Sequence, residues 1–342
     1  MTEGLPRVTA IVLAYATEPW LPRCVEALLA SEKAAVDVIV VDNGCTNDDV
    51  ENLRGVPGVT VLDPGANLGF AAGCNYGAER ATGDFIALVN NDAIVEPTTI
   101  ASLVSEASAP GVGIAGASVR LSEDPNLINS AGNPMHVLGL SWAGRMGQTE
   151  HLTAPQDVTI ASGACQVTSK AHWQRLGGFD PEYFMYHEDA ELSIRTWRQG
   201  LRVVYVPDAI AVHRYEFSRN SRKFYYIERN RLLLLGTIWG GRSLLVLSPA
   251  LLSLEAAMFL LSIKQGWVRE KVRGWGWLWK NRGHLRSRRK ALKAEKAVSD
   301  RVWMRQILTS RLEVGAELAP AALVKPLNVV MSGYWGIARH LI

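Results

Sequence analysis

The sequence predicts an α/β fold, in which a mostly parallel sheet is flanked by helices and a helical C-terminal region follows. In residues 8–119, short apolar runs of strand length alternate with stretches of helical periodicity, as expected for strands that are connected by helices. After residue 230 the apolar runs become long and are interleaved with Trp, Lys and Arg. A chain of 342 residues can form two domains, and we expect them at 1–225 and 226–342.

Five strands are expected in the N-terminal part, at residues 8–15, 35–42, 58–63, 84–90 and 111–119. Leu21, Val25 and Leu28 have helical spacing between the first two, and a helix over 70–81 leads into the fourth. The glycines at 65, 69, 73 and 77 recur every four residues, so on a helix they would form one small face for close packing. Ligands of such sheets bind beyond the carboxyl ends of the strands, which makes polar residues at these ends candidate site residues.

The chain beyond the fifth strand begins with a long loop or flap over 121–158, which is rich in Pro, Gly, Ser and Asn. A short strand, a helix and a Gly-Gly turn follow, and then the stretch "FMYHEDAELSIR" begins a second helix at residues 184–195. Within that helix, Glu191 and Arg195 have the spacing of an ion pair. Residues 201–214 are expected to form two short strands that end at His213.

Charge is distributed unevenly along the chain. From residue 214 onward there are 24 Lys and Arg against 8 Asp and Glu. Residues 1–213 hold 12 Lys and Arg against 25 Asp and Glu. Seven of the 11 tryptophans lie beyond residue 231, beside an apolar run at 243–263 that Pro249 and Glu255 interrupt. Trp with Lys and Arg suits an anionic membrane surface, and the apolar run favours lipid over nucleic acid as the partner. We expect helices that lie in the membrane interface.

Several classes of site are excluded by the motifs that the sequence lacks. The four cysteines show no C-x-x-C spacing, which argues against a zinc site or a disulfide framework. The chain has no Walker A sequence, no G-x-G-x-x-G turn after the first strand and no G-x-S-x-G elbow. The first 16 residues are a poor signal peptide.

The stretch "VNNDAIV" places Asp92 at the carboxyl end of the fourth strand, beside Asn90 and Asn91. Carboxylate oxygens bind Mg²⁺ or Mn²⁺ together with substrate phosphates, and an imidazole such as that of His213 tolerates Mn²⁺. Most aspartates at strand ends are caps, however, and a lone histidine is usually structural. Spacing alone therefore leaves both interpretations open.

The order of these blocks resembles glycosyltransferase family 2, whose catalytic domain has the GT-A fold, a Rossmann-like and mostly parallel sheet flanked by helices. The resemblance covers roughly residues 8–230, and it is most specific over 177–195. Within the family, the chain is most similar to bacterial rhamnosyl- and galactofuranosyltransferases that build cell-envelope glycans on polyprenyl-diphosphate lipids. The similar segments are "VTAIVLAYA", "VIVVDNG", "NLGFAAGCNYG", "VNNDAIV", "SGACQVTSKAHWQRLGGFDPEYFMYHEDAELSIR" and "AIAVHR".

The resemblance implies a donor site at the ends of the strands. A nucleotide sugar would be bound by five polar or aromatic residues, Tyr15, Asp42, Asn67, Asn75 and Asn91. Asp92, in the family's DxD-type motif, and His213 would bind Mn²⁺ or Mg²⁺. This chain has Asn90 where the motif has its first acidic residue, which leaves one carboxylate fewer for the metal.

The resemblance also implies an acceptor site around "HEDAE". Asp189 corresponds to the catalytic base, Glu188 is the second candidate, and Tyr186 and His187 would flank the acceptor sugar. Because Asp189 would lie at a helix N-terminus, its charged form should be favoured there. Inverting transfer needs such a base on the acceptor hydroxyl, in line with the bond that breaks.

The implied function is inverting, metal-dependent sugar transfer to a polyprenyl-diphosphate-linked glycan acceptor. Deoxythymidine-diphosphate rhamnose (dTDP-rhamnose) is the first expected donor, and uridine-diphosphate galactofuranose (UDP-galactofuranose) the second. The protein would act at the cytoplasmic face of the bacterial cell membrane, as a peripheral or monotopic protein. The alternative is a catalytically inactive membrane scaffold that binds nucleotide sugars. A nucleic-acid-binding function is not expected, because residues 1–213 are acidic.

Overall fold

The computed structural model describes residues 4–214, 221–313 and 321–342, and the chain forms two compact units. Unit 1 contains Met1–Asn133, Ala143–Thr196 and Leu201–Phe217, whereas unit 2 contains Pro134–Trp142, Trp197–Gly200 and Ser218–Ile342. The sequence places a single boundary at 225/226, whereas two short segments of the N-terminal part belong to unit 2. The end of unit 1 falls in 215–220, outside the described residues.

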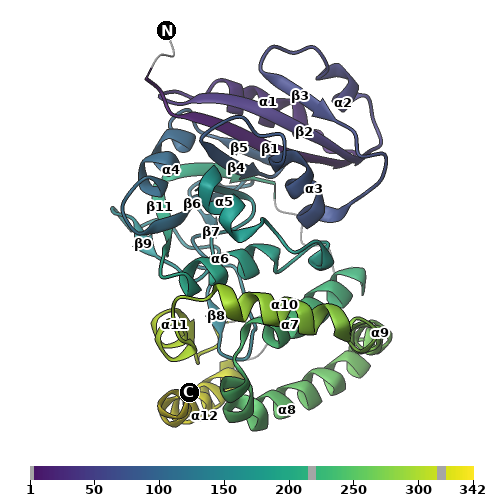
Figure 1. Ribbon diagram of the computed structural model, residues 1–342, viewed down its shortest axis with the longest axis vertical. Coiled ribbons are helices and arrows are strands. Elements are labelled where there is room, and N and C mark those ends of the chain that lie inside the picture. The colour runs from purple at the N-terminus through teal and green to yellow at the C-terminus, as the bar shows by residue number, and fades with distance from the viewer. Residues whose placement is uncertain (1–3, 215–220, 314–320) are drawn as a thin grey trace. The chain divides into compact units, whose positions relative to one another are not determined.

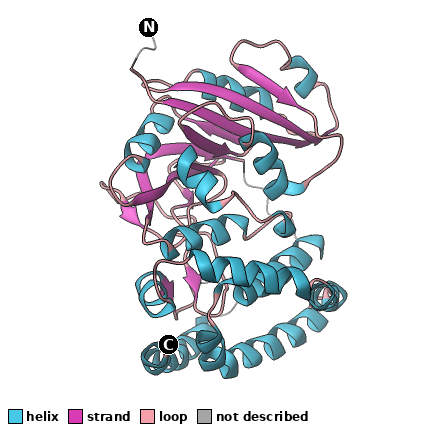
Figure 2. Ribbon diagram, in the orientation of Figure 1, coloured by secondary structure: helices cyan, strands magenta, loops and turns pink. Residues whose placement is uncertain are grey.

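Unit 1 is built on a mixed sheet (Figures 1 and 2). Its strands are β1 (Arg7–Ala16), β2 (Ala35–Cys45), β3 (Val59–Leu62), β4 (Phe85–Val89), β5 (Ala93–Val95), β6 (Val112–Leu121), β7 (Ile128–Ser130), β9 (Gln156–Asp157), β10 (Cys165–Ser169) and β11 (Arg202–His213). The order is β3-β2-β1-β4-β10-β6-β11-β5, and β7 and β9 pair with β6 and β11. Strands β3, β2, β1 and β4 are parallel, so their carboxyl ends meet at one edge.

All five predicted strands are present, as β1, β2, β3, β4 and β6, but two predictions downstream are wrong. Residues 201–214, predicted as two strands, form the single strand β11, whose register on β6 shifts between Val206 and Ile210. Pro207 lies in this irregular part, where its missing N–H interrupts no regular ladder. The predicted loop over 121–158 contains β7, β8 (Met135–His136) and β9, which are too short to give a periodic pattern.

Helices cover both faces of the sheet in unit 1 (Figure 1). The apolar sides of α1 (Leu21–Leu29) and α4 (Thr99–Ala107) pack into one core with alternate residues of β1, among them Val8, Ala10 and Val12. Successive strand residues point to opposite faces, so Ile11 and Leu13 lie on the other face, against α3 (Gly69–Ala78). The remaining helical elements are α2 (Asp49–Asn52), α5 (Lys170–Leu176), η1 (Pro181–Tyr183) and α6 (Glu188–Arg198).

The glycines of α3 allow this helix to approach the sheet closely. A Cβ atom on Gly73 would lie 2.6 Å from the side chain of Leu13, and one on Gly77 would lie 2.7 Å from that of Ile11. No side chain fits at these two positions without displacing a strand residue. The predicted small face is therefore present at Gly73 and Gly77, where it sets the distance between α3 and β1, whereas Gly65 precedes the helix and Gly69 faces Phe184.

Unit 2 is mostly helical. Its elements are α7 (Ser221–Ile238), α8 (Gly241–Lys264), α9 (Val268–Lys280), α10 (Arg282–Glu295), α11 (Asp300–Ile307) and α12 (Ala321–Leu341), with β12 (Leu308–Thr309) parallel to β8. The buried rings of Trp239 and Trp303 meet edge to face with centroids 5.3 Å apart. Within the described ranges, only α8 has the length and composition of a membrane-crossing helix. Pro249, which was expected to interrupt the apolar run, lies inside α8.

Four buried or nearly buried charges join α7, α8 and α9. Lys271 Nζ lies 2.6 Å from Glu228 Oε2 and 3.1 Å from Glu255 Oε2, and Arg231 binds both carboxylates. Each charge therefore has opposite charges beside it, which offsets the cost of taking it out of water. This network explains the single acidic residue of α8, because Glu255 fastens one side of that apolar helix to its neighbours.

A second charged cluster holds the segment after β7 to the sheet of unit 1. Glu150 accepts hydrogen bonds from the phenol of Tyr205, from Arg145 Nη1 at 2.8 Å and from the backbone N–H of Leu152 at 2.9 Å. Burial by itself would raise the pKa of Glu150, but these hydrogen bonds outweigh it and lower the pKa to about 2. The carboxylate therefore stabilises the folded unit above its ordinary pKa, and this contribution is lost as the pH falls toward 2.

Replacing Glu150 by Gln is expected to lower the free energy of unfolding at pH 7 by on the order of 2 to 3 kcal/mol. The difference from the wild type should shrink below about pH 4.5, where the wild-type carboxylate becomes protonated in the unfolded chain. Urea unfolding at a series of pH values measures it. Glu123→Gln, at an exposed position between β6 and β7, is the control, and an equal effect of both substitutions would rule out this role of Glu150.

Candidate active site

Tyr15 and Asp42 lie at the carboxyl ends of two neighbouring parallel strands. Asp42 pairs with Ala14 in the β1–β2 ladder, so Tyr15 follows directly beside it. The ring of Tyr15 is 53% exposed and lies against Gly44, while Asp42 Oδ1 accepts hydrogen bonds from the N–H groups of Gly44 and Cys45 at 3.2 and 2.9 Å. The exposed aromatic ring can stack on a planar base, and the fixed carboxylate beside it can accept hydrogen bonds from that base.

Two asparagines, Asn67 and Asn43, bind the start of α3. Asn67 is exposed, and its Oδ1 accepts the N–H of Gly69 at 2.8 Å. Asn43 is buried, and it accepts the N–H of Leu68 at 2.7 Å and donates to the carbonyl of Gly69 at 3.3 Å. Asn43 thereby holds the start of α3 against the end of β2.

Asn75, which is expected to bind the nucleotide sugar, binds the backbone of a turn instead. Its Oδ1 accepts the N–H of Phe179 and its Nδ2 donates to the carbonyl of the same residue, both at 2.9 Å. Gly178 has a φ of 65°, and a Cβ there would lie 2.4 Å from Asn75 Oδ1. Since both polar ends of the Asn75 amide bind the backbone, we assign it to the support of this turn and not to the donor site.

Asp92 and His213 are brought together by the pairing of β5 with the end of β11. Ala93 lies opposite His213 in this antiparallel ladder, so the preceding Asp92 points its Oδ1 to within 3.1 Å of His213 Nε2. On the other side of the ring, Nδ1 lies 3.0 Å from the amide oxygen of Asn129 in β7. Asn90 Nδ2 is 3.5 Å from His213 Nε2, and Asn91 beside it is partly exposed.

This arrangement fits a divalent cation. The Asn129 oxygen can only accept, so Nδ1 of His213 carries a proton, and whenever the ring is uncharged Nε2 presents a lone pair to the Asp92 carboxylate. Two acceptors that face each other across 3.1 Å repel unless a cation or a proton lies between them. Among the described residues, no three His, Cys, Asp or Glu side chains form a metal-binding group. The remaining ligands would be substrate oxygens, as is common for Mg²⁺ and Mn²⁺.

The predicted helix at "HEDAE" is present as α6, and its acidic residues have three different environments. Glu191 is fully buried and pairs with Arg195 at 2.9 Å, which confirms the predicted ion pair. Glu188 is 6% exposed, whereas Asp189 is only partly buried. Asp189 Oδ2 accepts the N–H of Gly163 at 3.1 Å, and Oδ1 accepts that of Ala190 at 2.7 Å. Asp189 is therefore the more accessible of the two candidate bases.

Burial governs the protonation of both acids. It raises the pKa of Asp189, although hydrogen bonds from Gly163 and Ala190 lower it in part. The helix N-terminus was expected to favour the charged form, and burial outweighs that effect. Glu188 has a pKa well above the ordinary value, because it is buried and lies near Asp189. A raised pKa brings Asp189 closer to neutral pH, where a carboxylate accepts a proton more readily.

The segment before α6 has an unusual backbone. Phe184, Tyr186 and His187 have φ values of 62°, 68° and 68°, in a left-handed region that costs such residues on the order of 1 kcal/mol or more each. The carbonyl of Phe184 accepts the N–H of Ala71 at 3.1 Å, which holds the segment to α3. Tyr186 is half-buried and His187 is buried. Strain of this kind concentrates at functional sites, and here it precedes Asp189 directly.

Residues 162–164 connect the two halves of the site. The N–H of Asn90 donates to the carbonyl of Ala164 at 3.0 Å, and the N–H of Gly163 donates to Asp189. Ser193, one turn further along α6, accepts the N–H of Ala161 at 3.3 Å. One short segment thus contacts both the start of the Asn90–Asp92 motif and the first turn of α6.

Comparison with known proteins identifies the family. The model of the glycosyltransferase-like family 2 matches residues 6–233, about two thirds of the chain. The chain belongs to glycosyltransferase family 2. It is a glycosyltransferase, and its mixed sheet flanked by helices is the GT-A fold.

This glycosyltransferase is similar to a bacterial rhamnosyltransferase and to a bacterial O-antigen biosynthesis protein. It is 30% identical over 243 residues to the N-acetylglucosaminyl-diphospho-decaprenol L-rhamnosyltransferase of Mycobacterium tuberculosis, with 62% of this chain and 76% of that protein covered. It is 27% identical over 231 residues to the O-antigen biosynthesis protein RfbC of Myxococcus xanthus, covering 64% of this chain and 18% of that protein.

Two solved structures have a similar fold. The crystal structure of GalNAc-T7 with UDP, GalNAc and Mn²⁺ has a TM-score of 0.58 at 17% identity, with 70% of this chain and 49% of that chain covered. The mannosyltransferase PcManGT from Pyrobaculum calidifontis, in complex with GDP-Man and Mn²⁺, has a TM-score of 0.52 at 17% identity, with 99% and 87% covered. At this level of identity the likeness concerns the fold.

Three residues of the site were not predicted from the sequence of this glycosyltransferase. Asn129 lies in a stretch that is rich in turn-forming residues, Asn43 follows the more conspicuous Asp42, and Gly163 contacts Asp189 through its backbone alone. Only for Asn43 was there a signal, because it stands with Asp42 at the carboxyl end of the second strand, where ligands of such sheets bind.

Proposed function

We propose that this glycosyltransferase transfers a sugar, with inversion, from a nucleoside-diphosphate sugar to a polyprenyl-diphosphate-linked glycan acceptor in cell-envelope synthesis. The similarity to the decaprenol-linked rhamnosyltransferase supports this most strongly, because it covers 62% of this chain and 76% of that protein. The same similarity favours dTDP-rhamnose as the donor, with UDP-galactofuranose as the second candidate.

The donor's nucleotide would bind at the ends of β1 and β2. Tyr15 can stack on the base and Asp42 can accept hydrogen bonds from the base or ribose. Asn67 would line the same pocket, and Asn91 would bind the ribose or the diphosphate. Asp92 and His213 would hold Mn²⁺ or Mg²⁺ against the diphosphate. When bound, the ion offsets the negative charge that develops on the leaving diphosphate.

Asp189 has the features of the general base. Two backbone N–H groups fix the direction of its carboxylate, and its raised pKa favours proton uptake. As the acceptor hydroxyl attacks the anomeric carbon, its proton passes to Asp189 while the bond from that carbon to the diphosphate breaks. Proton transfer accompanies the attack, since a carboxylate is too weak to ionise an alcohol beforehand. Tyr186 would contact the acceptor sugar, and the buried His187 would support this segment.

Unit 2 would hold the enzyme on the cytoplasmic face of the bacterial membrane, where a polyprenyl-linked acceptor is found. The exposed apolar side chains of α8 and α12 include Leu245 and Val329, which are 74% and 73% exposed. Basic residues are concentrated in the same unit. Because Glu255 fastens α8 to α7 and α9, a helix that lies in the interface is favoured over an isolated span.

A thermal-shift screen of nucleotide sugars with Mn²⁺ or Mg²⁺ tests the donor assignment. A donor at about 100 times its Kd stabilises the protein by about 2.7 kcal/mol, which corresponds to a rise in Tm of about 5 to 10 °C. We expect the largest rise with dTDP-rhamnose and a reduced rise in Tyr15→Ala. No rise with any donor and either ion would refute the proposed donor site.

A further inference from the structure

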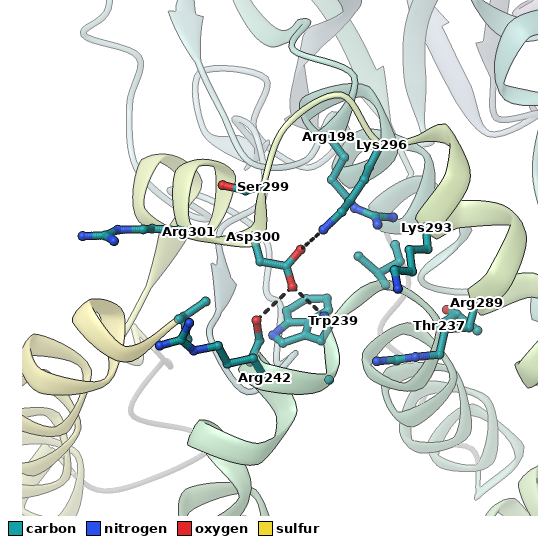
Figure 3. Close-up of a pocket in the computed structure, with 15 residues that line it drawn as sticks. Arg198, Thr237, Trp239, Arg242, Arg289, Lys293, Lys296, Ser299, Asp300 and Arg301 are labelled. Carbon is teal, nitrogen blue, oxygen red and sulfur yellow. Dashed lines mark hydrogen bonds and ion pairs between the residues drawn. The ribbon is translucent and has the colours of Figure 1, made fainter.

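Unit 2 contains a cavity of about 560 Å³, within the range of ~300 to 1,000 Å³ that is usual for ligand sites. It lies where α7 ends and α8 and α11 begin, and α10 forms one of its walls (Figure 3). All its lining residues belong to unit 2. They include six basic side chains, Arg198, Arg242, Arg289, Lys293, Lys296 and Arg301, and a single acidic one, Asp300.

The one carboxylate of the lining is already engaged. Asp300 Oδ2 accepts the N–H of Gly240 at 2.5 Å and the hydroxyl of Ser243 at 2.9 Å, so it caps the start of α8. Its Oδ1 lies 3.5 Å from Lys296 Nζ and 3.3 Å from Trp303 Nε1. The charge of Asp300 is thus shared between a helix start and one lysine, and the cavity keeps an excess of positive charge.

Two of the remaining cations are held in place by the fold. Arg198 is 4% exposed and donates to the carbonyl of Leu292 at 3.1 Å, and Arg289 donates to that of Gly236 at 2.6 Å. Figure 3 shows these two guanidinium groups and the amine of Lys293 on the same side of the cavity, with Arg301 turned away. Several fixed cations in one concave site suit a multiply charged oxyanion such as phosphate.

Two apolar helices extend from this cavity. Helix α8 begins in its lining, and Ile342 of the lining directly follows α12. The hydroxyl of Tyr334 in α12 donates to the carbonyl of Val246 in α8, which ties the two helices together. Their exposed apolar side chains include Leu245, Leu252, Leu260, Val329, Val330, Ile337 and Leu341, each at least 51% exposed. A soluble phosphate compound would make no use of these side chains, whereas a lipid would.

We propose that the cavity binds the phosphate group of a membrane lipid, with the lipid's hydrocarbon chains lying along the exposed sides of α8 and α12. The phosphate can come from an anionic phospholipid or from a polyprenyl diphosphate, and the second source rests on the proposed function. In either case the site lies in unit 2 and takes no part in the chemistry at Asp189.

Vesicle co-sedimentation of the full chain without donor tests the proposal. The vesicles consist of neutral phosphatidylcholine, alone or with either phosphatidylglycerol or polyprenyl diphosphate. The tested variant is Arg242→Glu/Lys293→Glu, at two exposed lining positions. We expect the wild type to prefer one of the anionic lipids and the variant to lose about tenfold or more of that preference, because each basic residue at a membrane contributes several-fold.

The matched control is Arg286→Glu/Lys290→Glu, which makes the same charge change at exposed positions of α10 outside the cavity. Equal losses in both variants would overturn the proposal, since the membrane would then respond to net charge alone. Binding of free pyrophosphate without any preference among vesicles would overturn the lipid assignment. The neutral pair Arg242→Gln/Lys293→Gln repeats the test if the reversed charges impair folding. Because no donor is present, the result is independent of sugar transfer.

Discussion

Replacing Asp189 by Asn is expected to reduce sugar transfer by about 10²- to 10⁴-fold, the usual contribution of a general base. Asn keeps the size of the side chain and can still accept the N–H of Gly163, so the first turn of α6 should remain in place. The amide cannot take the acceptor's proton. Donor binding, measured by the thermal shift, should be unchanged, because Asp189 is not among the residues proposed to bind the nucleotide.

Glu188→Gln is the matched control, since it makes the same change one residue earlier in α6. Transfer should stay within a few-fold of the wild type. The variant should also be more stable at neutral pH, because the raised pKa of Glu188 means that the folded protein loses stability as the pH rises above the ordinary pKa of a glutamate. If Glu188→Gln abolishes transfer and Asp189→Asn does not, the assignment of the base is reversed.

Replacing Asp92 by Asn is expected to lower transfer by about 10²- to 10³-fold and to weaken Mn²⁺ binding, since the site then lacks its one carboxylate ligand. Calorimetric titration with Mn²⁺ gives the affinity without any turnover. Asp208→Asn, at an exposed position of β11 five residues before His213, is the control and should bind Mn²⁺ normally. Unchanged Mn²⁺ affinity in Asp92→Asn would exclude this metal site.

The same titration separates a supporting role of Asn129 from a purely structural one. Asn129→Ala removes the acceptor that orients the His213 ring, and the loss of such a partner typically weakens metal affinity by about 10- to 100-fold. Asn129→Asp keeps an oxygen at the same place and should retain the affinity. If Asn129→Asp binds Mn²⁺ as weakly as Asn129→Ala, this role of Asn129 is excluded.

The architecture of unit 1 could be predicted from the sequence because its strands are buried on both faces. Such strands are nearly continuous apolar runs, so β1, β2 and β4 stand out, and the polar residue that follows each run lies at the functional edge. Asp42 and Asp92 could be located in this way. The Glu191–Arg195 pair could also be predicted, because it depends only on helical spacing.

Other features of the two units depend on contacts between residues that lie far apart in the sequence. The pattern of residues along the chain does not show such contacts. The family resemblance assigns Asn75 to the donor site, yet its amide is used by Phe179, 104 residues further on. The orientation of His213 depends on Asn129 in a three-residue strand without periodicity. The cavity in unit 2 is assembled from basic residues that look like an ordinary solvated helix face in the sequence.

The hydrogen bonds of α3 have a practical consequence for redesign of the enzyme. Asn43 binds the start of this helix, Asn75 binds the turn at residue 179, and Ala71 binds Phe184. Helix α3 and the segment before Asp189 are therefore coupled, so that a shift of one moves the other. A library that varies residues 69–75 to change the nucleotide would therefore also displace Asp189, the proposed base. The side chain of Tyr15 is 53% exposed and lies outside these hydrogen bonds, so an engineered change of donor should begin there.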